Sequence, residues 1–174
     1  MGQLPSSTPS LRVGDTTLIG PPGGAATEVR LRVARGPGLI GLSDVYGVVV
    51  LASVSNTSTM FEATRIGYNE HMRTLFVDRG LANHAQGAGW PTSSADGRQS
   101  DRLTEYSFAL NSATTPLDLV VLVDGALLEI CTNNRTVVAS VALTSTQAST
   151  RVGVFGLGPA RDIEFEAYTL GLNG

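Results

Sequence analysis

The stretch "LDLVVLVDGALLEICTNN", Leu117 to Asn134, decides the fold of this chain. It holds two apolar runs joined by Asp124-Gly125, a dipeptide that favours a tight hairpin because a type I′ turn needs positive φ at both central residues. Pairing outward from these two residues sets Val123 opposite Ala126. We therefore predict a hairpin of two antiparallel strands that fills the stretch.

Both faces of the predicted hairpin are apolar, because successive residues of a strand point to opposite sides. One face holds Val121, Val123, Ala126, Leu128 and Ile130, and the other holds Val120, Leu122, Leu127, Glu129 and Cys131. A strand with one wet face would alternate apolar and polar residues instead. We expect this hairpin to be covered on both sides, or to lie against something that the chain does not contain.

Two carboxylates, Asp124 and Glu129, interrupt this apolar stretch. A turn acid is the simpler interpretation of Asp124, and a sugar contact is the alternative. A buried carboxylate without a partner costs several kcal/mol, so Glu129 should lie near an arginine or hydrogen-bond donors. For Glu129, a structural ion pair and a role in ligand binding both remain open.

The rest of the chain consists of short β-branched runs separated by clusters of Gly, Asn, Pro and Ser, with almost no helical periodicity. This pattern is typical of an all-β fold, and we predict a two-sheet antiparallel β-sandwich of the jelly-roll, concanavalin-like kind. Strands are expected at residues 28–34, 47–53, 60–68, 74–78, 104–110, 117–123, 126–132, 136–143, 151–156 and 162–170. In the last of these, Ile163, Phe165 and Ala167 alternate with Asp162, Glu164 and Glu166, so the acids should form a solvated face rather than a site.

The length of 174 residues suits one domain of ordinary size. Residues 1–27 are rich in Pro, Gly, Ser and Thr, and we interpret them as a linker or poorly ordered lead-in to a sandwich domain at 28–174. Residues 80–101 form a long expected loop that contains Trp90. Such a loop inside a compact domain is usually functional or mobile.

The composition excludes several classes of partner. The net charge of −3 argues against nucleic acid, and no apolar run reaches the 18 or so residues of a membrane span. The start of the chain has no hydrophobic signal-peptide core.

His71 and His84 lack metal-ligand spacing, and no glycine-rich loop leads from a strand into a helix, so we expect neither metal nor cofactor. Cys131 is the one cysteine, which excludes an internal disulfide.

Two further motifs identify a family. "IGYN" at 66–69 leads into "LFVDR" at 75–79, and Val123-Asp124 is followed by Glu129-Ile130 and Asn133. Together these motifs resemble the C-terminal β-sandwich of glycoside hydrolase family 32, the family of invertases, inulinases, levanases and other β-fructofuranosidases. The resemblance covers about residues 28–170. Family 66 carbohydrate-binding modules resemble the same sandwich.

The resemblance implies that the family's chemistry lies in a β-propeller that precedes the sandwich. Retaining hydrolysis needs two carboxyl groups about 5–5.5 Å apart across the sugar. The propeller's Asn-Asp-Pro motif does not occur in this chain, and Arg161-Asp162-Ile163 and Glu129-Ile130-Cys131 only approach its other motifs from within predicted strands. We therefore expect no catalytic residue here and a structural or accessory role, with the propeller or a second copy of the chain as partner.

A free-standing fructan-binding module is the alternative function, and an active hydrolase is the least favoured. Fructose hydroxyls would be held by charged side chains over an aromatic or apolar floor. The candidates are Asp78, Arg79, Asp124 and Glu129, with Trp90 as a stacking platform. Asn56 and Asn134 begin glycosylation sequons and fit the extracellular location that the resemblance implies.

Overall fold

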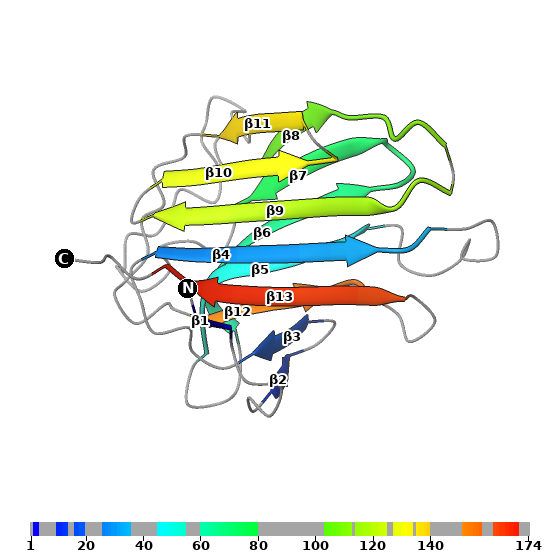
Figure 1. Ribbon diagram of the computed structural model, residues 1–174. Helices are drawn as coiled ribbons and strands as arrows, with labels where there is room; N and C mark the ends of the chain where they lie inside the picture. The colour runs from blue at the N-terminus through cyan, green and yellow to red at the C-terminus, as the bar shows by residue number, and fades with distance from the viewer. Residues whose placement is uncertain are drawn as a thin grey trace, which may run out of the picture.

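The computed structural model describes residues 2–3, 10–13, 16–19, 26–35, 45–54, 60–79, 103–112, 114–124, 127–133, 135–139, 151–157 and 162–170. Within these ranges the chain forms strands and turns and no helix. The strands make two antiparallel sheets that lie one in front of the other (Figure 1). The predicted two-sheet antiparallel β-sandwich is confirmed.

The sheet in front in Figure 1 has six strands in the order β1-β13-β4-β9-β10-β11. Its strands are β1 (Gly2–Gln3), β13 (Ile163–Thr169), β4 (Ala26–Val33), β9 (Leu117–Asp124), β10 (Leu127–Thr132) and β11 (Arg135–Ala139). The sheet behind has seven strands in the order β2-β3-β12-β5-β6-β7-β8. They are β2 (Ser10–Val13), β3 (Thr16–Ile19), β12 (Arg151–Phe155), β5 (Val45–Val54), β6 (Met60–Asn69), β7 (Thr74–Asp78) and β8 (Leu103–Ser107).

Every strand expected from the sequence has a counterpart, with ends that differ by a few residues. The N-terminal segment is where the structure departs from the expected linker. Three short strands, β1 to β3, lie within residues 1–27, and β4 already begins at Ala26. Leu18 of β3 is fully buried opposite Gly153, so strand pairing and apolar burial hold part of a segment whose composition otherwise resembles a linker.

The β9–β10 hairpin exists, but its predicted register is wrong. Val123 pairs with Leu128 rather than with Ala126, and Asp124 pairs with Leu127. Residues 125 and 126 therefore connect the strands and lie outside the described residues. Because the pairing moves by two residues, and side chains alternate with a period of two, every side chain keeps its predicted face.

The core lies between the inner faces of the two sheets. On the six-stranded sheet it contains Val29, Leu31, Val33, Leu117, Leu119, Val121, Val123, Leu128 and Ile130, and on the seven-stranded sheet Tyr46, Val48, Val50, Ile66, Tyr68, Leu75 and Val77. Each of these side chains is at most 3% exposed. The alternation expected for the last strand holds in part: Ala167 is buried on the inner side and Glu164 is exposed on the outer side, but Ile163, predicted on the inner face, is 42% exposed.

The outer face of the β9–β10 hairpin is open. Leu127 is 60% exposed, and Val120, Leu122 and Cys131 are only half-buried. Of the two expectations for this hairpin, burial on both sides is therefore wrong. Glu129 is exposed as well, so the expected need for a buried arginine partner does not arise.

The outer face of the seven-stranded sheet differs, because its apolar residues are buried. Leu18, Val49, Ala52, Ala63, Phe76 and Phe155 form a second apolar cluster, each at most 8% exposed. Gly67, which pairs directly with Gly47, makes room for its rings. A Cβ atom on Gly67 would lie 2.8 Å from the ring tips of both Phe76 and Phe155, a separation that real Cβ atoms do not reach.

Adjacent leucines of β10 give a matched test of this architecture. Leu128→Ala should lower the free energy of unfolding by about 2–5 kcal/mol, because it leaves a cavity in the core. Leu127→Ala, the same substitution one residue earlier on the open face, should change it by less than about 0.5 kcal/mol. Chemical denaturation measures both. Equal effects would contradict the assignment of the two faces.

Candidate functional site

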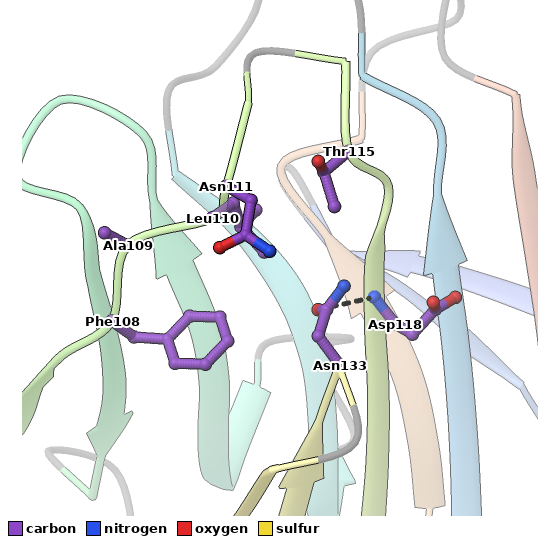
Figure 2. Close-up of a pocket in the computed structure, with 7 residues that line it drawn as sticks. All are labelled: Phe108, Ala109, Leu110, Asn111, Thr115, Asp118 and Asn133. Atoms are coloured by element: carbon purple, nitrogen blue, oxygen red, sulfur yellow. Dashed lines mark hydrogen bonds between the residues drawn. The ribbon is translucent and has the colours of Figure 1, made fainter.

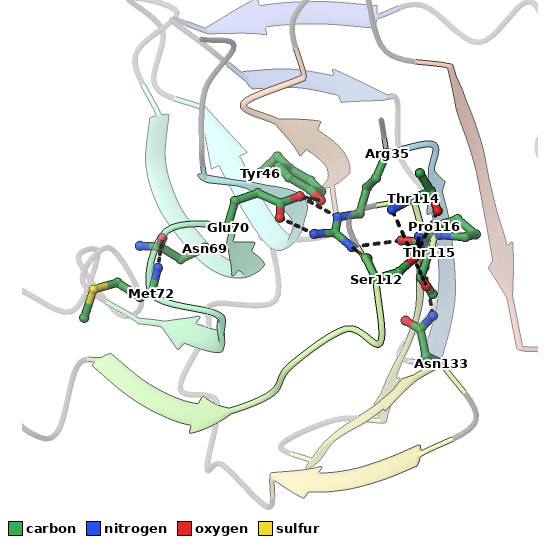
Figure 3. A network of polar contacts seen from close by, with 10 residues as sticks. All are labelled: Arg35, Tyr46, Asn69, Glu70, Met72, Ser112, Thr114, Thr115, Pro116 and Asn133. Carbon is green, nitrogen blue, oxygen red and sulfur yellow. Dashed lines mark hydrogen bonds and ion pairs between the residues drawn. The ribbon is translucent and has the colours of Figure 1, made fainter. Parts of the chain in front are cut away.

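A polar network joins the two sheets at one end of the sandwich (Figure 3). Arg35 follows the end of β4 in one sheet, and Glu70 begins the turn between β6 and β7 in the other. The Arg35 guanidinium donates from Nε to Glu70 Oε1 at 2.7 Å and from Nη2 to Oε2 at 2.5 Å. The hydroxyl of Tyr46, on β5, donates to Oε1 at 2.6 Å. A bidentate pair of this kind fixes direction as well as distance.

The same guanidinium also holds the connection between β8 and β9. Its Nη1 donates to the backbone oxygens of Ser112 at 2.8 Å and Thr115 at 3.0 Å. Its carbon lies 5.7 Å from the centre of the Tyr68 ring, within the range of a cation–π contact. Arg35, Glu70, Tyr46 and these two carbonyls are called the Arg35 clamp below.

The environment of the clamp fixes its protonation states. The hydrogen bond to Glu70 raises the pKa of Arg35 above its ordinary value, and burial only partly opposes this effect. Burial raises the pKa of the neighbouring Tyr68 hydroxyl, and the nearby Glu70 carboxylate adds to the shift. At neutral pH the arginine is therefore charged and Tyr68 is neutral. Such a charge-balanced arrangement suits a structural role.

Asn133 hydrogen-bonds the backbone on either side of the first residue of β9, next to the clamp. Its backbone is left-handed, with φ 47°, a conformation that asparagine tolerates better than most residues. Its side-chain amide donates to the backbone oxygen of Pro116 at 2.8 Å, and its side-chain oxygen accepts from the backbone nitrogen of Asp118 at 3.2 Å. The sequence singled out Asn133 only through the family resemblance, and the structure supplies this physical role.

A pocket of about 170 Å³ lies between these segments (Figure 2). Its lining residues are Phe108, Ala109, Leu110, Asn111, Thr115, Asp118 and Asn133. The Asp118 carboxylate points away from Phe108 and Asn133 and pairs instead with Arg32 at 3.4 Å. A pocket of this size has room for a few waters or one small molecule. It offers no pair of converging carboxylates for hydrolysis.

Three of the predicted sugar-binding residues, Asp78, Arg79 and Asp124, lie at one end of the sandwich, on different sheets. Asp124, the last residue of β9, pairs with Ala26, the first residue of β4. Arg35 lies just after the last residue of β4, so the clamp is at the opposite end of that strand. Asp78 ends β7, and the clamp residue Glu70 precedes the start of that strand. Asp124 and Asp78 therefore both lie at the end remote from the clamp. Asp78 and Arg79 are half-buried, and Asp124 is exposed.

The remaining candidates are more scattered. Glu129 lies on the outer face of β10, away from the strand ends. Trp90 and the two sequon asparagines, Asn56 and Asn134, lie outside the described residues. A sugar site built from these residues stays a prediction.

Within the described ranges, no group of three or more His, Cys, Asp or Glu residues could hold a metal ion. No helix in the same part of the chain is long and apolar enough to cross a membrane.

Comparison with known families and structures gives a consistent result. Residues 7–168 match the family described as "Glycosyl hydrolases family 32 C terminal". No match was found among curated protein sequences.

Solved structures share the fold over nearly the whole chain. A fructosyltransferase from A. japonicus is 18% identical with a TM-score of 0.64, covering 95% of this chain and 25% of its own. A β-fructofuranosidase from Aspergillus kawachii is 17% identical with a TM-score of 0.63, and the match covers 98% of this chain and 28% of the enzyme. A sucrose-6-phosphate hydrolase from Lactobacillus gasseri is 17% identical with a TM-score of 0.56, and the match covers 97% of this chain and 28% of the hydrolase. This chain thus spans less than a third of each of these three chains.

Substitutions of two arginines, one in β4 and one just after it, test how much the clamp contributes to the free energy of unfolding. Arg35→Ala should lower the free energy of unfolding by about 2–4 kcal/mol, because it leaves a largely buried carboxylate and two carbonyls without their donor. Arg32→Ala, which removes an exposed pair with Asp118, should cost at most about 1 kcal/mol. Chemical denaturation of both variants compares the two losses. A loss no larger for Arg35→Ala than for Arg32→Ala would show that the clamp is not needed for stability.

Proposed function

The chain belongs to the family of C-terminal domains of family 32 glycosyl hydrolases, and from this premise we propose that it is the accessory β-sandwich of an enzyme that hydrolyses sucrose or fructans. In this proposal the sandwich packs against a catalytic domain that the present sequence does not include. The domain stabilises its catalytic partner and carries no part of the bond cleavage itself.

One observation carries the proposal: the share of each chain that the structural matches cover. The A. japonicus and A. kawachii enzymes match 95% and 98% of this chain but use only 25% and 28% of their own lengths to do so. The remaining length of those enzymes has no counterpart here. The sequence agrees, because the Asn-Asp-Pro motif expected of the catalytic part is missing.

Two further properties belong to the proposal. An extracellular location fits the sequons at Asn56 and Asn134. A second copy of the chain is a further partner, because isolated domains with open apolar surface tend to associate.

The accessory role predicts where activity should be found. The purified chain should release no fructose from sucrose, inulin or levan. When the tagged chain is isolated from the cells that encode it, the captured fraction should release fructose, because the catalytic partner is retained. Reducing-sugar assays measure both preparations, and an unrelated tagged sandwich protein controls for adventitious capture.

Two results would overturn the accessory role. The first is turnover by the pure chain that Glu129→Gln abolishes, since this residue would then act in catalysis. The second is a captured fraction without fructose-releasing activity.

Fructan binding is the second candidate function. The observation that favours it is the placement of Asp78, Arg79 and Asp124 at the same end of the sandwich. Charged side chains at strand ends can hydrogen-bond the hydroxyls of one terminal fructose unit, with Glu129 and Trp90 as further candidates.

Isothermal titration with levan and inulin tests the binding site. Arg79→Ala and Asp124→Ala should each weaken binding by roughly 10- to 150-fold, the equivalent of one charge-assisted hydrogen bond. Asp118→Ala is the matched control, because Asp118 lies on the same strand as Asp124 but at the opposite end. Titration without detectable heat for either polysaccharide, or unchanged affinity in both variants, removes the site.

A further inference from the structure

The pocket beside the Arg35 clamp is lined by segments that belong to both sheets. Phe108 and Asn111 lie in the connection that leaves β8 of the seven-stranded sheet, and Asn133 follows β10 of the six-stranded sheet. In Figure 2 the Phe108 ring and the amides of Asn111 and Asn133 converge on the same space from three sides. Ala109 and Asn111 are exposed, so the pocket has an open rim. We call it the amide pocket.

The walls of the amide pocket are held in place by contacts that need no ligand. Arg35 Nη1 donates to the backbone oxygens of Ser112 and Thr115 and so fixes the connecting segment. The rings of Phe108 and Tyr68 meet edge to face, with their centres 6.3 Å apart and their planes at 90°. A site that does not have to be ordered on binding keeps more of its interaction energy as affinity.

Asn133 is fixed by hydrogen bonds at both ends of its amide. Its side-chain oxygen accepts from the Asp118 backbone nitrogen at 3.2 Å and from the Thr132 hydroxyl at 3.3 Å. Its side-chain nitrogen donates to the Pro116 oxygen at 2.8 Å. A carboxamide nitrogen carries two hydrogens. Among the residues that the structure describes, one N–H of Asn133 is therefore left for a ligand.

The Asn111 amide is the unoccupied hydrogen-bonding group of the pocket. It makes no hydrogen bond with any residue in the described part of the chain. A carboxamide presents an accepting oxygen and a donating nitrogen side by side in one plane. Two neighbouring hydroxyl groups match this pair, because one can donate to the oxygen while the other accepts from the nitrogen. Asn111 therefore suits a ligand with vicinal hydroxyls.

The charges around the pocket are already paired, which points to a neutral ligand. The carboxylate of Asp118, the charged residue among those that line the pocket, is turned away and pairs with Arg32 at 3.4 Å. The Arg35 guanidinium is engaged by Glu70 and two backbone oxygens. A charged ligand would lose its hydration here without gaining a partner of opposite charge.

The volume of the pocket limits the size of the ligand. Pockets for drug-sized ligands measure roughly 300–1,000 Å³. The amide pocket measures about 170 Å³, so it holds one small ring, and any longer chain would have to leave across the open rim. The Phe108 ring offers this small ring an apolar wall.

We propose that the amide pocket binds a single neutral sugar ring. Asn111 hydrogen-bonds two neighbouring hydroxyls, Asn133 donates to a further oxygen, and Phe108 packs against the C–H groups of the ring. A free monosaccharide and the terminal unit of a longer sugar present the same chemistry to these residues. Because the contacts are few, the dissociation constant should be on the order of millimolar.

Titration of the isotope-labelled full chain with fructose and with glucose, followed by NMR, tests the proposal. The side-chain amide signals of Asn111 and Asn133 should shift and saturate in the millimolar range. Asn111→Ala should raise the dissociation constant by about tenfold, because it removes a pair of hydrogen bonds. Asn111→Asp keeps the shape of the side chain but lacks its N–H donors, so it should also weaken binding. Both variants should fold normally, since Asn111 is exposed.

Controls separate the pocket from its surroundings. Glu105→Ala removes another exposed polar side chain, on β8 just before the pocket, and should bind sugars like the wild type. Glycerol offers vicinal hydroxyls without a ring and should bind several-fold more weakly than either monosaccharide. Inulin distinguishes the source of the sugar: shifts of the same amides show that a terminal unit can enter, and their absence restricts the site to free monosaccharides.

Three results would overturn the proposal. The first is the absence of shifts at Asn111 and Asn133 with both monosaccharides. The second is an affinity unchanged in both Asn111 variants. The third is glycerol binding as tight as that of the sugars, which would show an adventitious diol site only.

The amide pocket and the proposed fructan site fail separately. Fructan binding that Arg79→Ala and Asp124→Ala abolish, but Asn111→Ala leaves unchanged, would belong to the opposite end of the sandwich. The accessory role is tested by fructose release in the captured fraction and does not depend on either site.

Discussion

The ion pair between Arg35 and Glu70 determines how the two sheets are fastened together. Burial of apolar side chains between the inner faces stabilises the packing of the two sheets. Because this interaction is non-directional, it does not fix how the sheets are aligned along the strands. A planar guanidinium with a bidentate carboxylate on one edge and two carbonyls on another tolerates little displacement. The turn between β6 and β7, the segment before β9 and the end of β4 therefore take up fixed positions relative to one another.

Much of the fold could be predicted because its determinants are local. The Asp-Gly hairpin signal and the alternation of β13 each depend on neighbouring residues, and both predicted the right strands. The predicted hairpin register failed because Gly125-Ala126, one residue further along than Asp124-Gly125, also suits a two-residue turn, with glycine at its first position. Strand β3 was missed because its evidence is not local: Leu18 pairs with β12 and is buried in a cluster with residues of β5, β6, β7 and β12.

In the candidate site, too, the features that depend on neighbouring residues could be predicted, and those that depend on distant residues could not. Strand ends could be located from the sequence, so Asp78 and Asp124 were expected at the tips of strands, where the structure places them. The Arg35 clamp could not be predicted, because its partners lie 35 and about 80 residues away and no spacing rule connects them. Glu129 was misjudged for a related reason: two apolar faces suggest burial, but only the assembled sandwich shows which face is turned outward.

The paired glycines of β5 and β6 limit how the sequence of this sheet can change. Gly67 leaves a slot on the outer side of the seven-stranded sheet, and the rings of Phe76 and Phe155 fill it. An alanine in the slot meets a ring or a backbone oxygen, whereas a smaller side chain in place of a ring leaves a void. Relatives of this domain should therefore keep glycine at both positions even where the rings are replaced, because a backbone oxygen already lies too close to any Cβ atom there.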